Sequence, residues 1–119
     1  MLPFSTDLVT HRTGITAADS GNDPSAWADT PGAISLAGSK SIRIYPVVTG
    51  TNVVYTLRIV TKKGSNFFVS SPISSGSNPS EIITFTEDAY LGESACYIKI
   101  DTLTGTNPNV TLQVCGVSD

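Results

Sequence analysis

The sequence predicts a single all-β domain, an antiparallel β-sandwich or jelly roll of seven to eight strands with an irregular N-terminal arm. The chain of 119 residues contains 15 Ser and 15 Thr; Thr favours pleated strands and Ser favours turns. Charged residues are only 14%, below the roughly 25% typical of soluble proteins. Turn signals recur roughly every ten residues after residue 32, as in sandwiches and barrels. No segment has the length of a crossover helix, so the strands are expected to be antiparallel.

The strand signals lie between residues 33 and 117. The clearest alternation covers residues 53–60, where Val53, Tyr55, Leu57 and Ile59 share one face. Turns are predicted at 50–52, 62–66 and 104–108, with a long polar loop at 70–80, and no internal repeat is apparent. The remaining predicted strands are 33–36, 41–48, 67–70, 81–86, 94–102 and 109–117. These spacings fit a jelly roll and an immunoglobulin-like sandwich equally well.

Residues 1–32 differ from the rest and are interpreted as an arm, with the β-sandwich domain at residues 33–119. The segment 24–29 is expected to form one helical turn, with Asp23 as N-cap and Pro24 at the first helical position. A loop-like stretch of this length is unusual inside a compact domain. We therefore expect the arm to lie over the domain or a neighbouring molecule, and the domain to fold without it. Its expected partner-binding residues are Leu2, Phe4, Leu8 and Trp27.

The charge distribution is uneven although the net charge is only −3. Residues 40–63 contain five of the seven basic residues and no acidic residue, a pattern that suits head-to-tail contacts between copies. These bases are too sparse to indicate nucleic-acid binding. No apolar run approaches the roughly 18 residues of a membrane span, and no signal peptide follows Met1. The chain is expected to fold in a cytosol.

The two cysteines, Cys96 and Cys115, flank the predicted turn at 104–108. Alternation places Cys96 on the apolar face of its strand with Ile98 and Ile100, and Cys115 on the opposite face of the next strand. A disulfide would therefore require a β-bulge. Reduced thiols are the favoured interpretation.

Motifs for catalysis or metal binding are absent from the sequence. Residues 92–96 begin like a nucleophile elbow but end in Cys96 and lead into a strand. His11 is the only histidine, and its distance from both cysteines matches no zinc motif. The oxygen donors Asp19, Asn22, Asp23 and Asp29 lack EF-hand spacing, so we interpret them as turn and cap residues rather than calcium ligands. We expect no catalytic residue, no metal and no cofactor.

A second kind of site is a sugar-binding surface on the predicted final hairpin. Its outer face carries Tyr97, Lys99, Thr111 and Gln113, which combine an aromatic ring with hydrogen-bonding groups. The same pattern occurs on ordinary solvated sheets. The candidate glycan-stacking residues are Tyr97, Lys99 and Gln113.

In its general character the chain resembles small β-sandwich virion proteins of tailed phages, such as capsid decoration or cement proteins and fibre modules. The shared features are the irregular arm, hydroxyl-rich strands such as residues 41–45, the Asn-Pro turns and the lack of catalytic motifs. The resemblance implies a non-enzymatic virion protein, made in the host cytoplasm and often trimeric. It would bind the major capsid protein or another virion protein. A carbohydrate-binding or receptor-binding module is the alternative, followed by a small enzyme.

Overall fold

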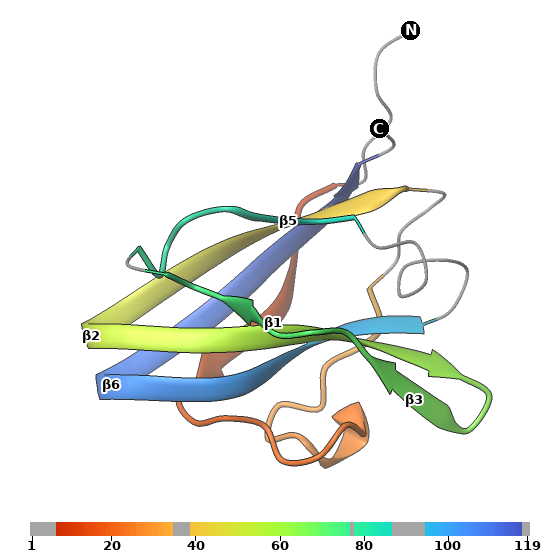
Figure 1. Cartoon of the computed structure of the whole chain (residues 1–119), viewed down its shortest axis with the longest axis horizontal. Helices are drawn as coiled ribbons and strands as arrows, with labels where there is room; N and C mark the ends of the chain where they lie inside the picture. The colour runs from red at the N-terminus through yellow and green to blue at the C-terminus, as the bar shows by residue number, and fades with distance from the viewer. Residues whose placement is uncertain (1–6, 35–38, 77, 87–94, 118–119) are drawn as a thin grey trace, which may run out of the picture.

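The computed structural model describes residues 7–34, 39–76, 78–86 and 95–117. Among them, six antiparallel strands form one sheet in the order β1-β6-β2-β3, with β4 and β5 also paired to β2 (Figure 1). The strands are β1 (Val9–Ile15), β2 (Ser41–Lys63), β3 (Asn66–Val69), β4 (Ile73–Ser74), β5 (Ile83–Phe85) and β6 (Ala95–Val117). The all-β, antiparallel prediction is confirmed. The described residues form six strands in one sheet, whereas we expected seven or eight in a sandwich.

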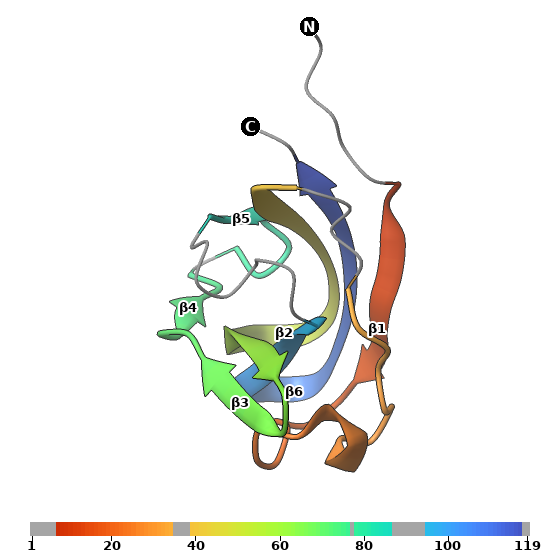
Figure 2. The same cartoon turned by 90° about the vertical axis from the view of Figure 1, so that its right-hand side faces the viewer.

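Two long strands, β2 and β6, build most of this sheet. Each is 23 residues long, and they pair from Ser41 opposite Val117 to Lys62 opposite Ala95. Both strands turn back on themselves at the left of Figure 1, and in Figure 2 their two halves curve around a common interior. A single folded sheet thereby encloses the core.

Each long strand bends at a turn predicted from the sequence, β2 at residues 50–52 and β6 at residues 104–108. In the structure neither segment is a hairpin turn between two separate strands. Both contain the tetrapeptide Thr-Gly-Thr-Asn, at residues 49–52 and 104–107. Gly50 and Gly105 have φ values of 114° and 123°, and the register shifts beside them. Residue types that close tight turns also permit a bulge that bends a continuous strand. The sequence in fact repeats Thr-Gly-Thr-Asn-x-x-x-Thr-Leu at 49–57 and 104–112, so the expectation of no repeat was wrong.

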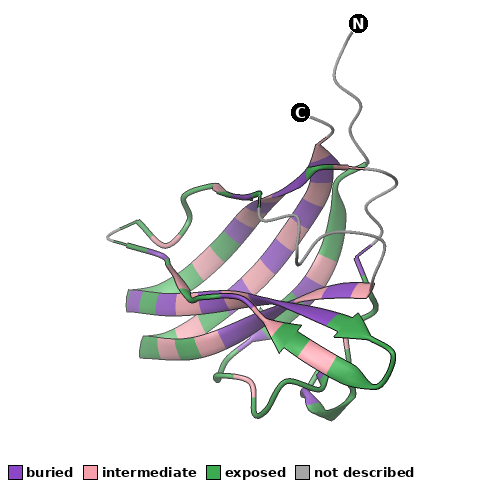
Figure 3. Ribbon diagram, turned by 45° about the vertical axis from the view of Figure 1, so that its right-hand side comes forward, coloured by how far each residue is buried: buried purple, intermediate pink, exposed green. Residues whose placement is uncertain are grey.

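The hydrophobic core lies between the two halves of the folded sheet. The face predicted within residues 53–60 is confirmed, since Tyr55, Leu57 and Ile59 are fully buried. Figure 3 shows buried and more exposed residues alternating along β2 and β6, as expected for strands with one face inward. The core residues from the other strand segments include Ile42, Ile44, Ile98, Ile100, Val110, Leu112 and Val114.

Several local predictions are confirmed. The β2–β3 hairpin forms, with Lys63 opposite Asn66, and β5 lies within the strand predicted at 81–86. The helical turn is the 3-10 helix η1 (Pro24–Ala26), capped by the Asp23 side chain. Of the strand predicted at 33–36, Ile34 forms a single bridge to Cys96, and residues 35–36 lie outside the described residues.

The final hairpin predicted from 94–102 and 109–117 does not exist, because these segments are the two halves of β6. Each half pairs with β2 instead, which places Cys96 opposite Thr61 and Cys115 opposite Arg43. Both cysteines are reduced, as predicted. The predicted face assignment of Cys96 is also confirmed, since Cys96 is a core residue.

The described part of the arm belongs to the sheet. Strand β1 pairs with β6, from Val9 opposite Val114 to Ile15 opposite Val110. The chain then follows the same edge of β6 through Asp19 and Ile34. The described part of the arm therefore supplies an edge strand to the same sheet as the residues after position 32. The described residues include no helix long and apolar enough to cross a membrane.

Candidate functional site

The arm covers the edge of β6 between Cys96 and Ile100 largely with side chains. A regular neighbouring strand would satisfy these backbone groups through its own backbone. Without the arm this edge would be open to pairing with another chain. Among the described residues, five hydrogen bonds join the arm to this edge, each given from donor to acceptor: Ile34 N to Cys96 O (2.8 Å), Ile98 N to His11 Nε2 (3.0 Å), Arg12 Nη1 to Ile98 O (3.2 Å), Ile100 N to Asp19 Oδ2 (2.7 Å) and Asp19 N to Ile100 O (2.9 Å).

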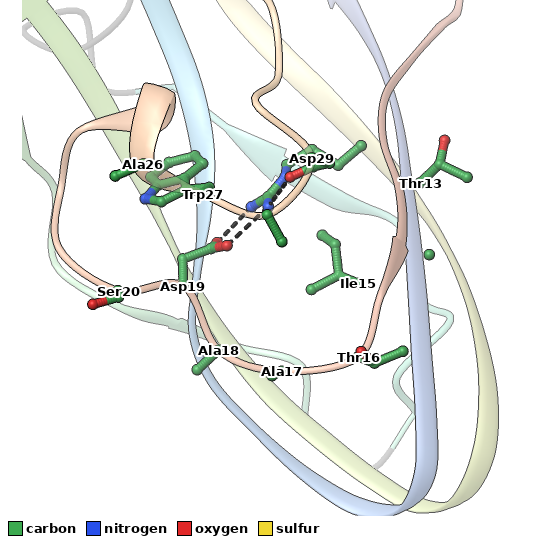
Figure 4. Close-up of a pocket in the computed structure, with 13 residues that line it drawn as sticks. Thr13, Ile15, Thr16, Ala17, Ala18, Asp19, Ser20, Ala26, Trp27 and Asp29 are labelled. Carbon is green, nitrogen blue, oxygen red and sulfur yellow. Dashed lines mark hydrogen bonds and ion pairs between the residues drawn. The ribbon is translucent and has the colours of Figure 1, made fainter.

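Arg12 is the centre of this contact and is only 2% exposed. Its Nη1 and Nη2 donate to Asp19, and its Nε and Nη2 donate to Asp29, so both pairs are bidentate (Figure 4). The Trp27 ring centroid lies 4.7 Å from the guanidinium carbon. With the bond to Ile98 O, all five N–H groups of Arg12 are satisfied.

The charges within the Arg12 cluster stabilise one another. Burial alone would lower the pKa of Arg12, but the hydrogen bonds and charges of Asp19 and Asp29 outweigh it and raise that pKa. Burial would likewise raise the pKa of Asp29, but Arg12 holds it below its ordinary value. The cluster is therefore an ion network that fixes the arm, and it presents no vacant cation to a ligand.

A cavity of about 320 Å³ adjoins this cluster, between residues 12–20 and 26–29 (Figure 4). Its walls include Ile15, Trp27 and several alanines. Its charged groups are Arg12, Asp19 and Asp29, which already pair with one another. The cavity therefore combines a partly apolar wall with charged groups that are already paired.

A second cavity, of about 190 Å³, lies where η1 faces the β2–β3 hairpin and β6. It contains Tyr97, one of the three predicted glycan-stacking residues, together with Lys62, Phe67 and Asp23. The structure does not bring all three predicted residues together. Lys99 is 9% exposed; its Nζ donates a hydrogen bond to Asn22 Oδ1 and forms an ion pair with Asp101 at 3.7 Å.

Gln113 lies away from this second cavity. It pairs with Thr10 of β1 and Tyr45 of β2, and it is not among the residues that line the cavity. Tyr97 and Gln113 lie apart because the predicted final hairpin does not form, and the two residues belong to different halves of β6.

The predicted partner-binding residues of the arm have different environments. Leu8 is 51% exposed, immediately before β1. Trp27 is 3% exposed, with its ring over Arg12 and its Nε1 donating to Gly21 O. Trp27 therefore stabilises the arm and is not accessible to a partner in this conformation. Leu2 and Phe4 lie outside the described residues.

The other reactive side chains are engaged or buried. Burial, and then the charge of Arg12, lower the pKa of His11 to about 4, so at neutral pH it is a neutral acceptor for Ile98 N. Burial raises the pKa of the Cys96 thiol to about 12. Residues 92–94 of the elbow-like segment lie outside the described residues.

The oxygen donors considered for calcium have other partners. Asp19 and Asp29 bind Arg12, Asp23 caps η1, and Asn22 accepts from Lys99. Within the described ranges, no group of three or more His, Cys, Asp or Glu side chains is arranged to hold a metal ion.

Sequence reasoning missed the role of Arg12. The available signal was that Arg12 is the only Lys or Arg among the first 39 residues, in a segment that also contains Asp19 and Asp29. A lone cation among carboxylates in an otherwise weakly charged segment favours pairing with them. The separations of 7 and 17 residues follow no local periodicity, so the pairing depends on the path of the arm.

Comparison with known proteins gives one informative likeness. The sequence matches no protein family and no curated protein. The structure is similar to the crystal structure of the SPBc2 prophage-derived protein YomS, with a TM-score of 0.55 and 12% sequence identity. The similarity covers 99% of this chain and 96% of that chain. The two proteins therefore share an overall fold.

Proposed function

We propose that this chain is a non-enzymatic structural protein of a phage virion, which decorates or cements the capsid. The observation that carries the proposal is the full-length likeness to a prophage-derived protein. The fit of both chains along nearly their whole lengths supports a common role for the whole domain. The proposed location is the virion, after synthesis in the host cytoplasm.

The proposed mode of attachment is surface complementarity at the beginning of the arm. From Val9 to Ile34 the arm is bonded to β6, so the clamp is confined to the residues before that contact and the start of β1. Leu8 and Val9 are each about half exposed on the edge of the sheet. Leu2 and Phe4 precede them and supply further apolar groups. A rigid base under a short clamp reduces the ordering entropy lost on binding.

The proposed partners are the major capsid protein, or another virion protein, and further copies of this chain in a trimer. Strand β1 is at the end of the strand order and pairs only with β6 among the described strands. An edge strand with exposed Leu8 and Val9 is suited to contact with another chain.

The experiment is mass spectrometry of purified virions from the phage that encodes the chain. Hundreds of copies per particle are expected of a decoration protein, whereas a handful would indicate a fibre or tail component. Absence of the chain from virions would overturn the proposal. A Leu8→Ser/Val9→Ser variant is expected to lose capsid binding, and Ile82→Ser, at an equally exposed position, is the matched control.

A further inference from the structure

The second cavity combines residues from three distant parts of the chain. The arm supplies Asp23, Pro24, Ser25, Thr30 and Pro31, the β2–β3 hairpin supplies Lys62 and Phe67, and β6 supplies Tyr97. Its volume of about 190 Å³ is below the roughly 300–1,000 Å³ of sites for drug-sized ligands. It therefore suits one ring of a ligand.

Two aromatic rings stand on the same face of the sheet in this cavity. Tyr97 is opposite Val60, and Phe67 is opposite Lys62; directly opposed residues share a face, as do residues two apart on one strand. Both aromatic residues are half-buried. The ring of His11 lies 6.4 Å from that of Tyr97, centroid to centroid. The two rings are thus held in place and remain partly open to solvent.

Hydrogen-bonding groups surround these rings. The two bonds to the Asp23 carboxylate, from Ser25 N at 3.0 Å and Ser25 Oγ at 2.7 Å, are both accepted by Oδ1. These bonds and the nearby Lys62 keep the pKa of Asp23 below its ordinary value. The Lys62 ammonium lies 5.8 Å from the Phe67 ring centroid. The cavity therefore offers an anionic acceptor, a cationic donor and hydroxyl groups around an aromatic surface.

We propose that this cavity binds one pyranose unit of a carbohydrate. The apolar C–H face of the sugar packs on Phe67 and Tyr97, while its hydroxyl groups donate to Asp23 and accept from Lys62. A phosphate group is disfavoured here because the single lysine is accompanied by the Asp23 carboxylate. This site is separate from the exposed Leu8 and Val9, so it goes beyond the proposed attachment to a capsid.

The test is a titration of the full chain by nuclear magnetic resonance with four methyl glycosides at millimolar concentrations. The probes are the glycosides of glucose, galactose, N-acetylglucosamine and glucuronic acid. At least one is expected to shift the resonances of Ser25, Phe67 and Tyr97 saturably, with Tyr45 and Phe68 unchanged. If none of the four does so, the proposal is overturned.

Matched variants define the site. Phe67→Ala is expected to raise the Kd at least about tenfold, a loss of about 1.4 kcal/mol, while Phe68→Ala, on the other face of β3, leaves it within about twofold. Equal effects of these two substitutions would overturn the proposal. If Phe67→Ala does not fold, the same comparison is made between Lys62→Gln and Lys63→Gln, since both side chains are exposed but only Lys62 lines the cavity.

Discussion

Gly50 and Gly105 form a reciprocal pair at the bend of the folded sheet. A Cβ atom on Gly50 would lie 2.7 Å from Asn107 O, and one on Gly105 would lie 2.9 Å from Asn52 O. Each glycine thus leaves room for the backbone of the opposite strand, next to the asparagine of the other Thr-Gly-Thr-Asn tetrapeptide. The repeated sequence and the antiparallel pairing together give the bend an approximate local two-fold symmetry.

Gly50→Ala and Gly105→Ala are expected to lower the free energy of unfolding by about 2–4 kcal/mol each, because both the φ angle and the opposite backbone exclude a side chain. The measurement is urea denaturation. Gly64→Ala is the control, because its φ is positive but no atom lies near the added Cβ; it should cost about 1 kcal/mol. Equal losses at Gly50 and Gly64 would contradict the close approach.

Arg12→Met is expected to destabilise the protein by about 3–5 kcal/mol, because it leaves the Asp19 and Asp29 carboxylates without their cation. Arg12→Lys should also destabilise, since one ammonium cannot form two bidentate pairs. Arg58→Met is the control: its ion pair with Asp101 is partly exposed, so about 1 kcal/mol is expected. Similar unfolding free energies for Arg12→Met and Arg58→Met would refute a stabilising role for the cluster.

His11 is expected to make stability depend on pH between about 6.5 and 4. Its pKa is about 4 in the folded chain and 6.5 ordinarily, so the unfolded chain binds the proton first as the pH falls. The contribution to stability is complete above pH 6.5, decreases as the pH falls, and is lost below about pH 4; a total of about 3 kcal/mol is expected. Urea denaturation at several pH values measures it. His11→Gln, whose amide oxygen can accept from Ile98 N, should flatten this profile, and an unchanged slope would exclude His11 as the cause.

Deletion of residues 2–30 is expected to unfold or aggregate the protein, because it removes most groups that bond to the edge of β6. This reverses the expectation that the domain folds without its arm. Deletion of residues 2–7 should leave the fold intact and is the appropriate test of the clamp. Hydrogen exchange checks both deletions through the Ile98 and Ile100 amides, which donate to His11 and Asp19. These amides should stay protected from exchange in the shorter deletion and should lose that protection in the longer one. Protected amides in the longer deletion would show that the arm is dispensable.

The two cysteines are expected to differ in reactivity toward a thiol reagent at pH 8. Cys96 is fully buried with a pKa of about 12, whereas Cys115 is half-buried on the outer face of β6. One thiol should react in the native protein and two in denaturant. The Cys115→Ser variant should then show no rapid reaction, and a rapidly reacting Cys96 would indicate that the arm edge opens readily.

The sequence alone determined the features that depend on neighbouring residues. Period-two alternation identified the apolar face of residues 53–60, and Asp23-Pro24 identified η1 and its cap. Gly64 and Ser65 lie at the turn of the confirmed β2–β3 hairpin. In each case the physical cause, a pleat or a cap or a tight turn, acts within a few residues along the chain.

Tertiary structure decided what depends on distant partners. The sequences around Gly50 and Gly105 are compatible with a hairpin turn as well as with a bend in a continuous strand. Only the long pairing of β2 with β6 determines that both segments are bends. The same pairing separated Gln113 from Tyr97. Arg12 meets Asp19 and Asp29 because the arm curls along an open strand edge, where a buried cation must be paired. Such contacts follow from the path of the chain in space, which no local periodicity of this sequence specifies.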